Sequence, residues 1–293
     1  MNKDIEEKIK NIFVNVFKEL VESLKRDFEK KLKNKNKQFI YKTLLDEEVL
    51  RCLALTSSLE SKVGNSLNKF LLRLLKEEDI MNHFGWLSLK EIKKFFEDKG
   101  INLDLDTNKG FSIGCCLEIP DIDLSNLKFQ RKEKEENKKK LLDDLLEEKF
   151  KMVKMEGKEQ KKFGVDLILI TKDKRSIYLF EIKAGGDIDL KKAQTEVTNL
   201  IKTYLALKKL FGNELNIKFY FATLYNPRGE ETSWKGSVGK FLDKDKILIG
   251  KDFWEFIFNK IISFEDFKRI YKDAAEESGV AEVIRDLLKK NSS

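Results

Sequence analysis

The sequence predicts an α/β protein in which helices flank a mixed sheet, with a largely helical region on its N-terminal side. In the first part of the chain, apolar residues recur at steps of three and four, the spacing of one helix face. From residue 163 they instead form short runs bounded by turn residues, which is typical of strands. The succession of strand, strand, helix and strand then favours a sheet with helices packed on it.

This change of pattern divides the chain into four segments. Residues 1–127 are expected to form a helical region packed on the core, and 128–162 a charge-dense connecting segment. Residues 163–262 are expected to form the α/β core, and 263–293 the C-terminal helices.

Three helices are expected before residue 100. The first carries one apolar stripe, formed by Ile5, Ile9, Ile12, Val16, Leu20, Leu24 and Phe28. The second starts near a capping pair of Thr43 and Asp46 and is interrupted around 57–64. A capping box at 88–91 opens a short third helix, which Gly100 ends.

The core segment begins with a predicted hairpin. Its strands are FGVDLILIT (163–171) and SIYLFEIK (176–183), and its turn spans 172–175. A helix from Asp189 to Gly212 follows, with strands at 217–224 and 247–249 and a helix from about Asp252, in which Trp254 is a core residue.

Composition limits the function. The net charge of +7 favours a polyanionic partner such as nucleic acid, although a solvated charged surface explains it too. Three cysteines form no disulfide or zinc pattern, and no segment has the length and apolarity of a membrane span or a secretory signal, so we expect a reduced, cytoplasmic protein. The only histidine, His83, is expected to be structural. Without a second histidine, we exclude histidine-dependent nucleases, serine hydrolases with a histidine base and most zinc hydrolases.

Three ionisable residues are expected to converge at one end of the hairpin. Glu181 and Lys183 are two apart in a strand and so project from the same face. Asp166, near the start of the preceding strand, is brought alongside them by the antiparallel turn. Phosphodiester hydrolysis needs such a set, because carboxylates hold Mg²⁺ and a lysine can orient the attacking water. An ordinary surface ion pair is the alternative explanation.

The motif Gly164-Val165-Asp166, followed by Glu181-Ile182-Lys183, resembles the core of the PD-(D/E)xK nucleases. The segments FEIKAGGDIDLKKAQTEV, FATLYNPRGEETSW and ILIGKDFWEFI are similar to the TdeIII/MjaII-type type II restriction endonucleases. This resemblance covers about 163–260, and the N-terminal helices only loosely. It departs from the pattern at Val165, where the motif has proline; a literal Pro120-Asp121 lies too far from Glu181 for the hairpin geometry.

The resemblance implies a PD-(D/E)xK restriction-endonuclease-like fold that cuts double-stranded DNA at a short palindrome, GGNCC-like, using Mg²⁺, which Mn²⁺ can replace. It implies metal ligation by Asp166, Glu181 and the Ile182 carbonyl, with Lys183 beside the attacking water. It also implies a homodimer and a cognate DNA methyltransferase as a functional partner.

Further candidates have weaker signals. A carboxylate from the N-terminal helices, Glu60, is a candidate for the metal site, and Gln194 and Glu196 are candidates for groups behind it; solvent-facing positions are the alternative for all three. Candidate DNA contacts are Lys191 and Lys192 for phosphates, and Asn226, Arg228 and Glu230 for base edges, against an ordinary basic surface and a structural turn.

Three alternative functions stay open at this stage. One is a repair or junction-resolving nuclease with the same chemistry, and another is a DNA-binding protein without catalysis. A structural protein with a charged surface is the third. It would leave unexplained the clustering of Asp166, Glu181 and Lys183, called the trio below.

Overall fold

The computed structural model describes residues 2–106, 110–115, 161–185, 188–234 and 236–289. These residues form two compact units, of which unit 1 contains 1–74 and 258–293 and unit 2 contains 75–257. The expected charged segment 128–162 and Pro120-Asp121 fall almost wholly outside the described residues. None of the described helices has the length and apolarity needed to cross a membrane.

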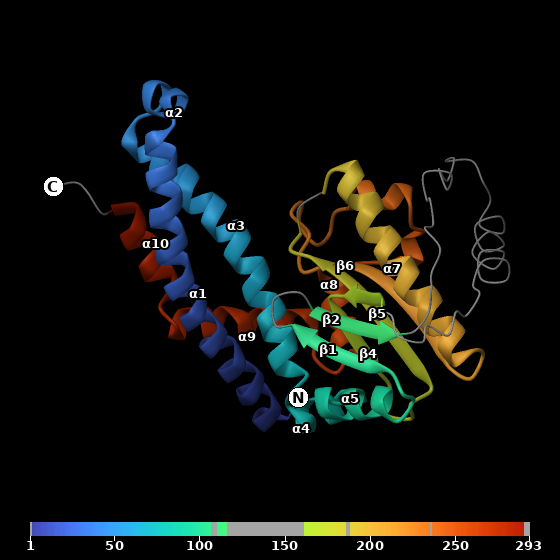
Figure 1. Cartoon of the computed structure of the whole chain (residues 1–293). Helices are drawn as coiled ribbons and strands as arrows, with labels where there is room; N and C mark the ends of the chain where they lie inside the picture. The colour runs from blue at the N-terminus through green and yellow to red at the C-terminus, as the bar shows by residue number, and fades with distance from the viewer. Residues whose placement is uncertain (1, 107–109, 116–160, 186–187, 235, 290–293) are drawn as a thin grey trace. The chain divides into compact units, whose positions relative to one another are not determined.

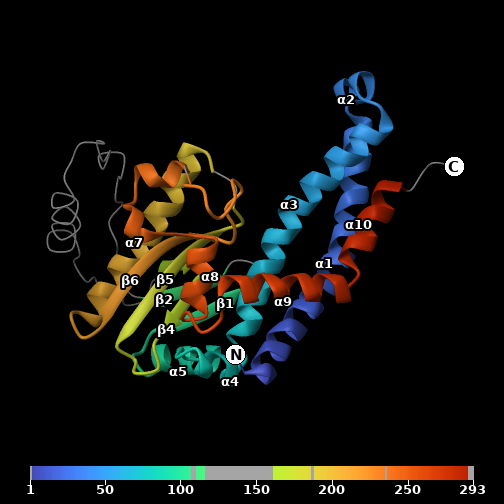
Figure 2. The ribbon, with the colours of Figure 1, turned by 180° about the vertical axis from the view of Figure 1, so that it is seen from behind.

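Unit 1 is helical. It consists of α1 (Lys3–Lys37), α2 (Phe39–Leu44), α3 (Glu47–Leu74), α9 (Phe264–Glu277) and α10 (Val280–Lys289). Helices α1 and α3 form a long hairpin with α2 at its tip. Helix α9 crosses this helix pair away from the tip (Figures 1 and 2). The C-terminal helices therefore share a unit with the N-terminal helices, whereas the sequence suggested that these two segments were separate.

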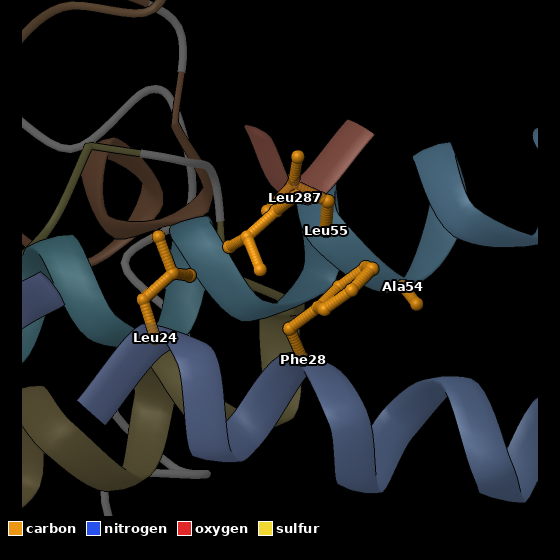
Figure 3. Packing of buried hydrophobic residues seen from close by; sticks show 5 residues of the cluster. All are labelled: Leu24, Phe28, Ala54, Leu55 and Leu287. Carbon is orange, nitrogen blue, oxygen red and sulfur yellow. The ribbon is translucent and has the colours of Figure 1, made fainter. Parts of the chain in front are cut away.

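One hydrophobic cluster of unit 1 is formed by residues of three helices. Leu24 and Phe28 of α1 meet Ala54 and Leu55 of α3 and Leu287 of α10 (Figure 3). The buried stripe of α1 confirms the helix that the apolar spacing predicted. Burying this stripe supplies most of the stability of such helices, because intrinsic helix propensity alone is weak.

The second helix differs from its prediction. Thr43 lies inside α2, and Asp46 alone caps α3 by accepting from Val49 N at 2.8 Å. No interruption occurs around 57–64, since α3 is continuous through these residues. Packing against α1 outweighs the weak helix propensity of the serines and Gly64 in this stretch.

Unit 2 begins with α4 (Glu78–His83) and α5 (Leu89–Glu97), whose capping box at Ser88 and Glu91 is confirmed. A hairpin of β1 (Asn102–Asp106) and β2 (Gly110–Cys115) follows, where the sequence predicted only helices. The prediction was wrong here because the alternation of buried Leu103, Phe111 and Ile113 with polar residues is a strand pattern.

The strands of unit 2 form two sheets (Figure 1). The first is antiparallel, in the order β1-β2-β3, with β3 at Lys161–Val165. The second has the order β4-β5-β6-β7, with bounds Leu167–Ile170, Ser176–Lys183, Asn216–Thr223 and Ile247–Ile249. Strands β4 and β5 are antiparallel, as predicted, while β5, β6 and β7 are parallel.

The predicted strand 163–171 is thus divided at Asp166, with one half in each sheet. Helix α7 (Leu190–Phe211) connects β5 to β6; it starts at the Asp189 cap and ends at Gly212, as predicted. Helix α8 (Lys251–Ile257) follows β7 and buries Trp254. Connections of this kind place the loops after β5 and β6 at one edge of the sheet, where ligands bind in open α/β sheets.

Candidate active site

Asp166 lies at the bend between β3 and β4 and is bonded twice to β5. Its backbone N donates to Phe180 O at 3.0 Å, and its Oδ2 accepts from Ile182 N at 2.7 Å. Because the N–H and C=O of one strand residue point to the same side, the Ile182 carbonyl also faces Asp166. The bend therefore holds this carboxylate against the carboxyl end of β5.

Three carboxylates surround the ammonium of Lys183. Its Nζ forms an ion pair with Glu181, lies 3.2 Å from Glu196 Oε1, and lies 3.9 Å from Asp166 Oδ2. Glu181 is buried, with 6% of its surface exposed, and is one of the few buried charged residues among those described. Taking these charges out of water is costly, and their ion pairs with Lys183 offset that cost.

The pKa values of the cluster reflect burial and mutual charge. Burial, and then the Asp166 charge, raises the pKa of Glu181 to about 8, against the opposing effect of Lys183. Burial also raises the pKa of Asp166 above its ordinary value, despite the nearby Lys183. Burial by itself lowers the pKa of Lys183, but the carboxylates, Glu181 first, outweigh it and raise that pKa. Strong shifts of this kind are common in active sites.

The oxygens of the cluster suit a hard divalent cation. Asp166 and Glu181 supply carboxylates, the donor type that Mg²⁺ prefers, and a cation between them would compensate their negative charges and so favour their ionised forms. Within the described part of the chain, however, no group of three acidic, histidine or cysteine side chains forms a preformed metal site. Lys183 stands among the carboxylates instead, so a cation at Glu181 must compete with its ammonium.

Three further residues were expected near the metal site. Of these, Glu196 forms an ion pair with Lys183. Gln194 is half-buried on the same helix, α7. Glu60 is exposed on α3 and belongs to unit 1, whereas the trio belongs to unit 2.

The candidate DNA-contacting residues divide into two groups. Lys191, Lys192 and Arg228 are exposed. The side chains of Asn226 and Glu230 instead bond backbone groups of the protein: Asn226 Nδ2 donates to Thr232 O in the same loop, and Glu230 accepts from the backbone N of Asn226 and of Lys251, the first residue of α8, both at 2.9 Å. As the loop stands, these two side chains organise it, and Arg228 is left to face outward.

Sequence reasoning missed Gly110, which packs closely against the bend at Asp166. A Cβ on Gly110 would lie 2.5 Å from Val165 O and 2.7 Å from Asp166 Cα, so only glycine fits against this backbone. The signal was present in the turn residues Asn108-Lys109-Gly110 between two alternating apolar runs, which predict a hairpin.

Comparison with known families places the chain in a protein family. A model of the family described as "Type II restriction endonuclease, HinfI" matches residues 1–275, which include both the N-terminal helices and the cluster around Lys183. No match was found among curated proteins or among solved structures. The TdeIII/MjaII-type resemblance is not the family that this match reports. Since the match spans nearly the whole sequence, the chain belongs to the HinfI family of type II restriction endonucleases.

Proposed function

We propose that this protein is a Mg²⁺-dependent endonuclease that cuts both strands of double-stranded DNA at a short palindrome. Membership of a restriction endonuclease family supports DNA cleavage. The observation that carries the chemistry is the gathering of Asp166, Glu181 and Glu196 around Lys183 at the carboxyl end of β5. The PD-(D/E)xK class is the assignment that this spacing and hairpin favour.

In this proposal, Asp166, Glu181 and the Ile182 carbonyl hold Mg²⁺, which supplies charge neutralisation and a more acidic bound water. Lys183 lies beside the attacking water and, as an ammonium, orients it and stabilises the negative charge that develops on the phosphate. Glu196, whose oxygen lies 3.2 Å from Nζ, would hold the Lys183 ammonium at the site if Glu181 were bound to the metal. Asp166 keeps its orientation through the Ile182 amide.

Substrate symmetry supports the proposed assembly. One such cluster hydrolyses one strand in one orientation, so a double-strand break at a palindrome calls for two copies related by a two-fold axis. A homodimer supplies them, and a cognate DNA methyltransferase protects the host's own sites. The exposed Arg228 is the proposed base reader. A GGNCC-like site rests on the TdeIII/MjaII resemblance alone and stays a prediction.

The test is plasmid cleavage measured together with DNA binding. Asp166→Ala, Glu181→Ala and Lys183→Ala should each abolish cleavage, while Lys183→Ala still shifts DNA in a gel. Lys172→Ala is the matched control, because Lys172 is exposed in the turn at the other end of the same hairpin. Substantial cutting by any trio variant would place the active site elsewhere. Discrete fragments with defined ends support a restriction enzyme, whereas nicks at branched DNA would indicate a junction nuclease.

A further inference from the structure

Tyr225 lies at the same sheet edge as Lys183. Thr223, the last residue of β6, pairs with Lys183 in the parallel ladder. The ladder then continues, with Leu224 N donating to Lys183 O at 3.0 Å and Tyr225 N to Ala184 O at 3.2 Å. Tyr225 therefore follows β6 where the chain also leaves the end of β5.

The position of the Tyr225 ring is fixed by its surroundings. Its backbone oxygen accepts from Thr223 Oγ1 at 3.0 Å. Its ring lies directly on Gly185, two residues after Lys183: a Cβ at Gly185 would meet three ring carbons at 2.6–2.7 Å. The glycine thus leaves the space that the ring fills, and the ring contacts the chain where it leaves β5, two residues after Lys183.

This fixed ring is open to solvent. Tyr225 is 40% exposed, although its neighbours Leu224 and Asn226 are buried. Among the described residues of unit 2, it is the only exposed phenylalanine, tyrosine or tryptophan; the other exposed one in the described chain, Tyr41, belongs to unit 1. The other described phenylalanine, tyrosine and tryptophan residues of unit 2 are at least half-buried, so packing accounts for their presence. Packing does not account for the exposed face of Tyr225.

The charges on the connections at this edge suit a polyanion. Lys191 and Lys192 are exposed in the first turn of α7, which follows β5, and Arg228 is exposed in the loop that contains Tyr225. An aromatic face among basic side chains is the combination by which proteins hold nucleotides, because the ring packs on the base or sugar while cations neutralise phosphates.

We propose that the exposed face of Tyr225 packs against a nucleotide adjoining the scissile phosphate and positions that phosphate at Lys183. The inference rests on the proposed endonuclease function and adds a substrate-positioning residue to it. Because the ring face makes the contact, the phenol oxygen is dispensable.

Two measurements test this contact. In the first, 5-iododeoxyuridine is placed in turn at nucleotides flanking the cut, and the duplex is bound to the Lys183→Ala protein with Ca²⁺ and irradiated. Mass spectrometry of the crosslinked peptide should identify Tyr225. Crosslinks found only at other residues would overturn the proposal, and this readout needs no change at Tyr225.

In the second, Tyr225→Phe should cleave within about twofold of the native rate, whereas Tyr225→Ser should lose about 5- to 150-fold in kcat/KM, the range for one base–aromatic contact. Tyr41→Ser is the matched control and should leave kcat/KM unchanged. Equal losses in Tyr225→Phe and Tyr225→Ser, or no loss in either, contradict the proposal. A native protein that cuts no DNA refutes the endonuclease function itself, so the two failures are distinguishable.

Discussion

Gly110→Ala provides a sharp test of how the bend at Asp166 is held. Gly110 has a φ of +81°, where a residue with a Cβ costs about 1–2 kcal/mol. The new methyl group would also lie 2.5 Å from Val165 O, about 0.9 Å inside the 3.4 Å at which ordinary contact begins. Its neighbours there are backbone atoms that cannot rotate away, so relieving this clash costs about 1–3 kcal/mol more.

The relief must come from movement of the backbone that carries the Asp166 carboxylate. A misplacement of about 1 Å at a catalytic centre can lower the rate about 100-fold, so we expect Gly110→Ala to lower kcat by this order. Gly100→Ala is the matched control, because Gly100 has a φ of +70° with nothing within 4 Å of its added Cβ. It should cost stability but not activity.

Single-turnover cleavage and thermal unfolding of both variants, compared with the native protein, separate strain from displacement. A folded Gly110→Ala protein that cleaves at the native rate would refute this account of how the bend is supported. Loss of activity in Gly100→Ala as well would mean that glycine strain in general, and not the contact with Asp166, controls the rate.

Three further predictions follow from the site. Ca²⁺ should support DNA binding without cleavage and Mn²⁺ should replace Mg²⁺, as metal-dependent cleavage assays after chelation would show; activity that follows bound zinc would contradict this. The metal-free protein should lose stability as pH rises from about 4.5 to about 8, because the unfolded state ionises Glu181 while the folded state, with its raised pKa, retains the proton. Melting curves of the native and Glu181→Gln proteins check it: the slope should be smaller in the variant, which keeps only the contribution of Asp166, whose pKa is also raised. Arg228→Ala should weaken discrimination by about 1–3 kcal/mol per base contact without affecting metal binding, and sequencing the cut ends measures it.

The hairpin and its trio could be predicted from sequence because their signals are local. Strand alternation puts Glu181 and Lys183 on one face, and the turn length brings Asp166 back beside them. Helix α7 was equally predictable, since Asp189 caps its start and Gly212 ends it. Each of these features is decided by residues that lie close together in the chain.

The remaining features depend on contacts that no short window contains. The division of the strand at Asp166 follows from the pairing of β3 with β2, whose partners are about fifty residues apart. The continuity of α3 depends on packing against α1. The roles of Asn226 and Glu230 were not visible because their partners are backbone amides and carbonyls, and backbone groups carry no sequence signal.

The division at Asp166 has a direct consequence for the chemistry. A residue inside a continuous strand spends its backbone groups on the ladder and directs its side chain perpendicular to the sheet. At the bend, Asp166 still bonds Phe180 through its backbone, but its carboxylate turns along the sheet edge to accept from the Ile182 amide. That turn brings one Asp166 oxygen to 3.9 Å from the Lys183 ammonium, while Glu181 approaches Lys183 from the strand itself. Carboxylates from the bend and from the strand thus both approach the Lys183 ammonium, and the hairpin of β1 and β2 places Gly110 against the bend.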